Sequence, residues 1–131
     1  MKVLIIDGQG GKLGKMLVEA VINNYPSYEI TAVGTNSTAT ESMLKGGAKL
    51  AATGENAVVV AARTADCIIG PIGIVVADSM LGEITPATAL AVAQSSAEKI
   101  LLPANRCGVK IAGFPELTMA QMVSEAVKLL G

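Results

Sequence analysis

Short apolar runs alternate along the chain with longer segments whose apolar residues recur at helical spacing. The first run, residues 2–6, ends at Asp7 and is typical of a strand that is buried on both faces. Residues 12–24 follow with the spacing of a helix that packs on a sheet. Its apolar positions are Leu13, Met16, Leu17, Ala20 and Val21. Pro26 should stop this helix, because the residue before a proline avoids the helical conformation.

The same alternation continues to the end of the chain. We expect further strands at residues 28–33, 48–52, 67–69, 99–102 and 109–112, and further helices at residues 39–44, 57–63, 85–97 and 115–130. Valines at 58–60 favour a strand, but the alanines around them favour a helix. Residues 73–84 fit neither pattern and predict a structured loop or a short helix. The chain is therefore predicted to be an α/β protein, a three-layer Rossmann-like sandwich around a mostly parallel sheet of five or six strands.

The composition fits one compact domain that spans residues 1–131. Of these residues 51% are hydrophobic and only 2% are aromatic, which suits alanine-rich helices on parallel strands. The mean hydropathy is +0.54, yet no run reaches the ~18 apolar residues that a membrane helix needs. We expect no membrane partner, and we expect some apolar surface to be buried between copies of the chain in a homo-oligomer.

Charge and residue types argue against several classes of function. The net charge is −1 and no basic cluster is present, so we expect no nucleic-acid partner. The chain has no histidine, and its two cysteines lack metal-ligand spacing, so we expect no metal site and no histidine-based triad. Cys67 fits the core, and Cys107 lacks a histidine base to activate it. The apolar start is too short for a signal peptide, and we expect a cytoplasmic protein.

The strongest chemical signal is a glycine-rich turn between the first predicted strand and the first predicted helix. Three of its glycines follow a G-x-x-G-x-x-G pattern, which lets the backbone turn sharply and approach a phosphate closely. The helix then offers free N–H groups and the positive end of its dipole to an anion. The candidate ligand-binding residues of this turn are Gly8, Gln9, Gly10, Gly11, Lys12, Leu13 and Gly14.

Two interpretations of the glycine turn stay open. The glycines either bind a phosphate or nucleotide, or they only make a tight connection from strand to helix. Lys12 adds positive charge at the phosphate in the first interpretation and is a solvated helix residue in the second. The first requires the N–H groups at the start of the helix to be reachable. A turn filled by the protein's own side chains would leave only a scaffold.

The turn after the second predicted strand bears on which nucleotide is bound. NAD-binding folds usually place an acidic residue there, which hydrogen-bonds the ribose hydroxyls. Thr35, Asn36 and Ser37 instead offer hydroxyl and amide groups and no carboxylate. We therefore expect NADP or NAD as cofactor, with NADP preferred, and another nucleotide as a further possibility. An ordinary capped turn is the alternative interpretation.

Polar residues also follow the other predicted strands, at the edge of a parallel sheet where ligands bind. The candidates are Thr53, Gly54, Glu55, Asn56, Gly70, Pro71, Asn105 and Arg106. Glu55 and Asn56 either meet a ribose or base, or cap the next helix. Arg106 either binds an anion or is a surface residue at a turn. For Asp78 and Glu83 we expect solvated or capping roles rather than acid–base chemistry.

Four short motifs together resemble a family of short bacterial proteins of unknown function, over the whole chain. They are DGQGG at residues 7–11, TGENA at 53–57, GPIG at 70–73 and NRC at 105–107. The resemblance implies a bacterial, cytosolic, Rossmann-like protein and no particular activity. The glycine turn is also similar to those of extended short-chain dehydrogenases and of proteins of the dihydrodipicolinate-reductase type, over the first quarter of the chain.

These observations predict a nucleotide- or dinucleotide-binding protein that acts as a ligand-binding or regulatory module, with a phosphorylated small molecule as its partner. The alternative is a small NAD(P)-dependent oxidoreductase. Dehydrogenases of this fold usually need more chain for a substrate pocket, so such an enzyme would complete its active site by oligomerisation.

Overall fold

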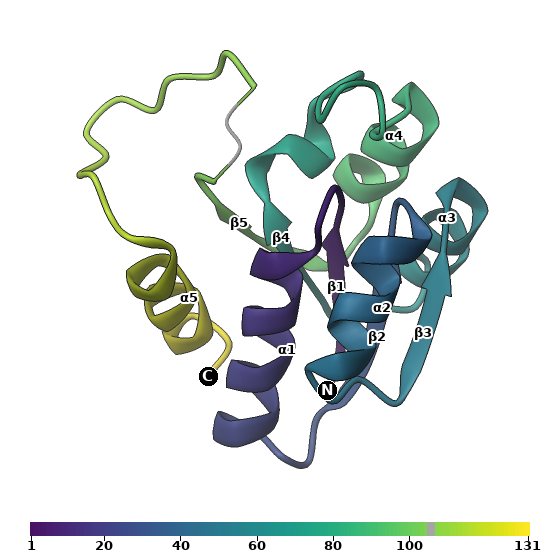
Figure 1. Cartoon of the computed structure of the whole chain (residues 1–131), viewed down its shortest axis with the longest axis vertical. Coiled ribbons are helices and arrows are strands. Elements are labelled where there is room, and N and C mark those ends of the chain that lie inside the picture. Colours follow the sequence, from purple (N-terminus) through teal and green to yellow (C-terminus); the bar gives the residue numbers. More distant parts are fainter. Residues whose placement is uncertain (105–106) are drawn as a thin grey trace.

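The computed structural model describes residues 1–104 and 107–131 and shows strands that alternate with helices (Figure 1). The strands are β1 (Lys2–Asp7), β2 (Glu29–Gly34), β3 (Leu50–Thr53), β4 (Cys67–Pro71) and β5 (Glu98–Leu102). The helices are α1 (Lys12–Asn24), α2 (Ser37–Lys45), α3 (Glu55–Ala62), the short 3-10 helix η1 (Ile72–Val75), α4 (Pro86–Gln94) and α5 (Met119–Lys128).

The five strands of the described residues form one parallel sheet in the order β3-β2-β1-β4-β5. Asp7 at the end of β1 lies opposite Gly34 at the end of β2, so both strands finish at the same edge. The chain order reverses direction between β1 and β4, and ligands of open α/β sheets bind outside the strand ends at such a point. The predicted α/β, Rossmann-like class is confirmed, and the sheet is parallel throughout.

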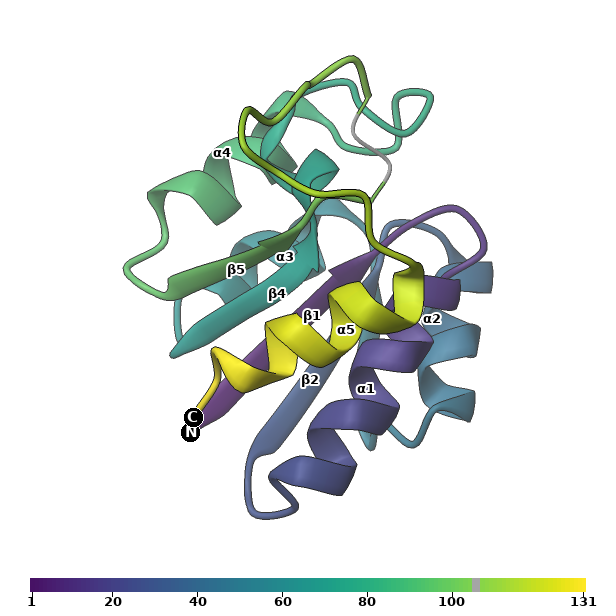
Figure 2. The ribbon, with the colours of Figure 1, turned by 90° about the vertical axis from the view of Figure 1, so that its left-hand side faces the viewer.

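Both faces of the sheet are buried under helices, which gives the three layers. Val3 and Ile5 of β1 belong to the core on the side of α1 and α5, whereas Leu4 and Ile6 belong to the core on the side of α3 and α4. Figure 2 shows α1 and α5 over the face turned to the viewer and α3 and α4 behind the sheet. Successive side chains of a strand point to opposite faces, so a strand buried on both faces reads as an unbroken apolar run.

The C-terminal part of the chain departs from the sequence-based expectation. Residues 109–112 form no strand, and the last helix begins at Met119 rather than at residue 115. A capping box sets this start: the Thr118 hydroxyl accepts the N–H of Gln121 (3.2 Å), and the Gln121 side chain accepts the N–H of Thr118 (2.8 Å). None of the helices in the described part of the chain has the length and apolar content needed to cross a bilayer.

Close packing explains why three of the four positions in the turn require glycine. A Cβ atom on Gly8 would lie 2.6 Å from the Thr35 hydroxyl oxygen, and one on Gly14 would lie 2.7 Å from the Met43 sulfur. Gly11 has a φ of +73°, and its Cβ would lie 2.7 Å from the Ala39 backbone. Gly10 differs from the others, because a Cβ there would meet no atom within 4 Å.

We expect Gly11→Ala to destabilise the fold by about 2 kcal/mol or more, from left-handed strain and from the clash with the start of α2. Gly10→Ala is the matched control and should change the free energy of unfolding by less than about 0.5 kcal/mol. Urea denaturation followed by circular dichroism measures both. Equal stability of the two variants would contradict the packing role of Gly11.

Candidate functional site

The glycine turn lies at the carboxyl edge of the sheet, between β1 and α1. The N–H of Gly11 donates to the carbonyl of Gly8 (2.9 Å) and closes the turn. Gln9 has a φ of +49°, in the left-handed region that favours glycine. Gln9 and Gly10 are exposed, whereas Gly8 and Gly11 are buried. The tip of the turn is therefore the part that a ligand can reach.

Asp7 holds the two ends of this turn together. Its carboxylate is only 2% exposed and accepts the N–H of Gly8 (2.8 Å) and the N–H of Gly14 in the first turn of α1 (2.7 Å). Burial raises the pKa of Asp7 above its ordinary value. The bonds from Gly14 and Gly8 lower that pKa by less, and the negative charge of Glu83 raises it further.

Three N–H groups of the turn are open. Those of Gly10, Lys12 and Leu13 donate to no acceptor among the residues that the structure describes. The latter two belong to the first turn of α1, where backbone N–H groups lack partners within the helix and the helix dipole is positive. The side chain of Lys12 is exposed beside them. These groups suit an anion.

The neighbouring N–H group, that of Gln9, already donates to a carboxylate of the chain, that of Glu83. Oε1 of Glu83 accepts the N–H of Gln9 (2.9 Å), the hydroxyl of Thr35 (2.8 Å) and the side-chain amide of Asn36 (2.7 Å). The protein thus fills the β2 side of the turn, whereas the N–H groups of Gly10, Lys12 and Leu13 have no acceptor among the described residues. The expectation that Glu83 has a solvated or capping role is wrong, because the carboxylate is bound by three donors from two strand ends.

These hydrogen bonds also set the charge state of Glu83. Partial burial acts to raise its pKa, but the bonds from Gln9, Thr35 and Asn36 outweigh that effect, so the pKa lies below its ordinary value. The carboxylate is ionised at neutral pH. The acidic group that sequence reasoning missed after β2 is therefore present in space, supplied by the segment that follows β4.

The start of α2 completes the wall of the turn. Asn36 caps this helix, since its side-chain oxygen accepts the N–H of Ala39 (2.8 Å), and its amide also donates to the carbonyl of Gln9 (3.0 Å). Ser42 of α2 donates to the carbonyl of Gly10 (2.8 Å). Ser37 is exposed at the first position of α2. The structure thus brings the predicted residues Thr35 and Asn36 to the glycine turn.

The predicted residues after β3 and β4 have local partners instead. Thr53 shares a hydrogen bond with Thr40 (2.6 Å), and Glu55 accepts the hydroxyl of Thr85 at the start of α4 (2.5 Å). Gly54 is the N-cap of α3, whose first turn holds Glu55 and the exposed Asn56. No hydrogen bond joins any of these residues to the glycine turn in the described part of the chain.

The end of β4 is a packing element. A Cβ on Gly70 would lie 2.5 Å from the carbonyl oxygen of Ile6, so only glycine lets β4 lie this close to β1. Pro71 is buried and precedes η1. Cys67, in the same strand, is 3% exposed, and burial first, then the charges of Glu98 and Asp66, raise its pKa to about 11. The predicted residues Asn105 and Arg106 lie outside the described residues.

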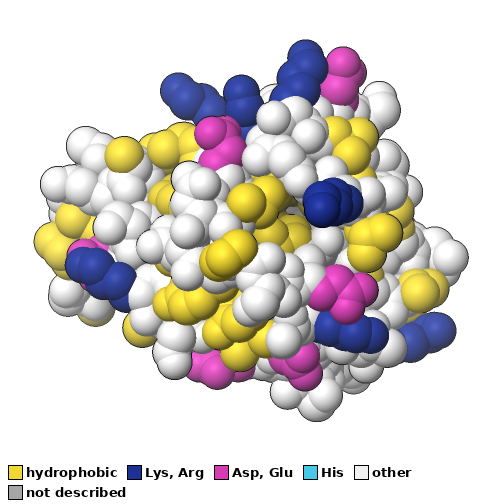
Figure 3. Space-filling model, turned by 90° about the horizontal axis from the view of Figure 1, so that it is seen from below, with side chains coloured by type: hydrophobic (Ala, Val, Ile, Leu, Met, Phe, Trp, Pro, Cys, Tyr) yellow, Lys and Arg dark blue, Asp and Glu magenta, His cyan; other side chains and the backbone are white. Residues whose placement is uncertain are grey.

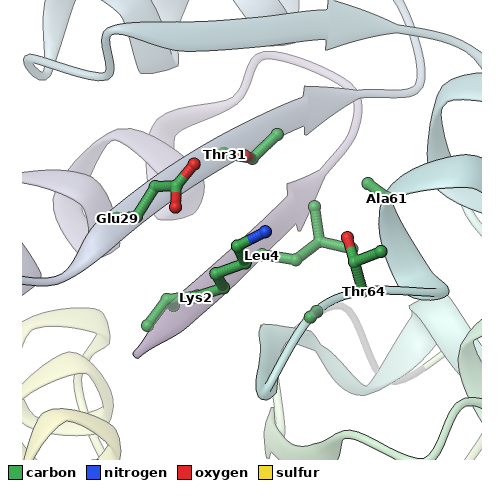
Figure 4. Close-up of a pocket in the computed structure, with 8 residues that line it drawn as sticks. Lys2, Leu4, Glu29, Thr31, Ala61 and Thr64 are labelled. Atoms are coloured by element: carbon green, nitrogen blue, oxygen red, sulfur yellow. The ribbon is translucent and has the colours of Figure 1, made fainter.

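Hollows elsewhere on the surface lie away from the turn. One of about 80 Å³ lies beside the first residues of β1 and β2 (Figure 4), too small for a nucleotide. Another of about 540 Å³ lies by the amino ends of β2 and β3. It is lined by Ile22, Pro26, Tyr28, Glu29, Ile30, Gly46, Gly47, Ala48, Lys49 and Leu50. Seen from below, hydrophobic side chains gather in the middle of the molecule, between charged groups (Figure 3).

Comparison with solved structures supports the fold. The chain is similar to a dodecameric FMN-dependent Ubix-like decarboxylase from Escherichia coli O157:H7, with a TM-score of 0.51 and 15% sequence identity. The match covers 99% of this chain and 94% of the decarboxylase chain. Identity at this level reflects a shared fold alone. No curated protein matches the chain.

The expectation of NADP or NAD, with NADP preferred, is contradicted by this comparison, because the similar structure is that of an FMN-dependent protein. The geometry gives a physical reason for rejecting NADP. The hydroxyl and amide groups of Thr35 and Asn36 were the reason to prefer NADP. They instead bind the Glu83 carboxylate, and this charge repels the 2′-phosphate of NADP.

The family comparison covers nearly the whole sequence. A model of a domain of unknown function, DUF3842, matches residues 2–131. The sequence motifs pointed to a family without an assigned activity, and this match agrees with that coarse expectation. The chain belongs to the DUF3842 family.

Proposed function

We propose that this chain is a binding module for a phosphorylated, nucleotide-like ligand, held at the glycine turn between β1 and α1. The open N–H groups of Gly10, Lys12 and Leu13 receive the phosphate, and the positive end of α1 and the Lys12 side chain add favourable charge. The observation that carries the proposal is the neighbouring Gln9 N–H, which already holds a carboxylate oxygen. Backbone donors in this turn therefore face an anion.

Two further facts support this position for the ligand. The turn lies where the strand order reverses between β1 and β4, the usual ligand edge of such sheets. A protein of similar fold depends on FMN, a phosphorylated ligand, which makes FMN the first probe. Binding rather than a reaction is proposed, because the carboxylates of Asp7 and Glu83 are both engaged by donors of the protein.

We also propose that copies of the chain associate through the apolar face around Leu50. This side chain is 49% exposed and lines the hollow of about 540 Å³ at the amino ends of β2 and β3. β3 is the last strand in the sheet order, and an edge strand offers unpaired backbone groups to another chain. The similar decarboxylase is a dodecamer. Apolar exposure of this kind favours burial between subunits.

Gly10→Asp should weaken FMN binding at least about tenfold, because it places a negative charge beside the proposed phosphate without a packing clash. Gly10→Ala is the matched control and should bind within about twofold of the wild-type protein. Quenching of flavin fluorescence measures both affinities. Equal FMN affinity of Gly10→Asp and wild type would place the phosphate elsewhere. Failure of FMN, AMP and inorganic phosphate alike to raise the melting temperature would refute the proposal.

Leu50→Lys should convert the wild-type multimer to a monomer at micromolar concentration, because a buried interface desolvates the ammonium group. Size-exclusion chromatography with light scattering gives the mass. Leu90→Lys is the control: Leu90 is 54% exposed on α4, away from this face, and its change should leave the mass unaltered. A wild-type monomer under these conditions would remove the proposal of self-association.

A further inference from the structure

The segment after η1 has an unusual backbone. Asp78, Met80 and Leu81 have φ values of +67°, +56° and +56°, and Gly82 follows at +90°. A residue with a side chain in the left-handed region costs about 1–2 kcal/mol. The fold therefore accepts strain in several neighbouring residues to give this loop one particular shape. Such strain is concentrated at functional positions.

The loop is nevertheless firmly anchored. The N–H of Asp78 donates to the carbonyl of Ile84 (2.7 Å), and the Ser79 hydroxyl donates to the carbonyl of Gly73 (2.6 Å). Met80 is 3% exposed and Ile84 is fully buried in the core beneath α3 and α4. A loop with two buried apolar anchors and closed hydrogen bonds is a fixed platform, not a mobile lid.

This platform places Glu83 at the end of β2. Oε1 receives all three of the donors from Gln9, Thr35 and Asn36. The second oxygen, Oε2, accepts no hydrogen bond from any residue in the described ranges. A carboxylate pinned by one oxygen, with the other unoccupied, is preorganised to accept donors from a ligand.

We propose that Glu83 is a specificity-determining residue that recognises adjacent hydroxyl groups of the ligand, as on the ribose of a nucleotide or the ribityl chain of FMN. This inference rests on the proposed phosphate site. Hydroxyl groups donate to a carboxylate, and hydrogen bonds to a charged acceptor are the stronger class. The same charge rejects a ligand that carries a second phosphate in place of these hydroxyls. The acid reaches the end of β2 from the loop after β4.

The phosphate and the hydroxyl groups of the ligand would then bind at neighbouring parts of the glycine turn. Glu83 accepts a hydrogen bond from the N–H of Gln9. The next N–H along the chain, that of Gly10, has no acceptor among the described residues. Consecutive Cα atoms lie about 3.8 Å apart, so both parts are within reach of one small sugar phosphate. The Glu83 carboxylate therefore leaves the N–H groups of Gly10, Lys12 and Leu13 available to donate hydrogen bonds to the phosphate of the ligand.

The test compares ribose 5-phosphate with 2-deoxyribose 5-phosphate by isothermal titration calorimetry. The wild-type protein should bind the ribose compound about tenfold more tightly, because the deoxy compound lacks one hydroxyl donor to a charged acceptor. Glu83→Gln and Glu83→Asp should each abolish this preference. Glu55→Gln is the matched control: Glu55 bonds Thr85 and not the turn, so the preference should persist. Two variants of Glu83 guard against one of them failing to fold.

The possible failures are distinguishable. Equal binding of both sugar phosphates by the wild-type protein, at the affinity of inorganic phosphate or above, overturns the role of Glu83 and leaves the phosphate site intact. Tighter binding of both compounds and of inorganic phosphate by Glu83→Gln overturns it differently, because the carboxylate then competes with phosphate. Binding of none of the three ligands by any variant refutes the phosphate site itself.

Discussion

The buried carboxylate of Asp7 joins the end of β1 to the first turn of α1, and the geometry of the whole site depends on this contact. It accepts N–H groups from Gly8 and Gly14, which compensates for burying a polar group that is 2% exposed. Because it uses the N–H of Gly14, the N–H groups of Lys12 and Leu13 are the ones left at the open side of the helix. The contact also explains Gly14, since a Cβ there would lie 2.8 Å from the Asp7 side chain.

Two carboxylates lie close to a turn that is proposed to bind an anion, and their surroundings divide the site into two parts. Burial raises the pKa of Asp7, whereas the donors from Gln9, Thr35 and Asn36 lower that of Glu83. The negative charge of Glu83 lies on the β2 side of the turn, and the positive end of the α1 dipole lies on the other side. This polarity fits a ligand with an anionic end and a hydrogen-bond-donating end. It does not fit a ligand that is anionic at both ends.

Local patterns predicted most of the elements, and the errors have physical causes. The helix at residues 12–24 agrees with α1 because its apolar spacing and its stop at Pro26 are local features. The helix at 57–63 agrees with α3 in spite of its valines. The strand expected at 109–112 does not form, because β-propensity counts only where a neighbouring strand and buried face are available. The start of α5 was readable in principle, since Thr118 and Gln121 have the spacing of a capping box.

The sequence by itself determined the α/β class, the parallel sheet and the position of the glycine turn, because apolar periodicity and glycine content act between residues close in the chain. Tertiary structure alone decided what faces that turn. Thr35 and Glu83 are 48 residues apart, and only the parallel order of β1, β2 and β4 brings the loop after β4 over the end of β2. The acidic residue that NAD-binding folds usually place after the second strand is therefore absent from the local sequence but present in space as Glu83. A contact at such separation depends on the packing of the whole sheet, which no local pattern encodes.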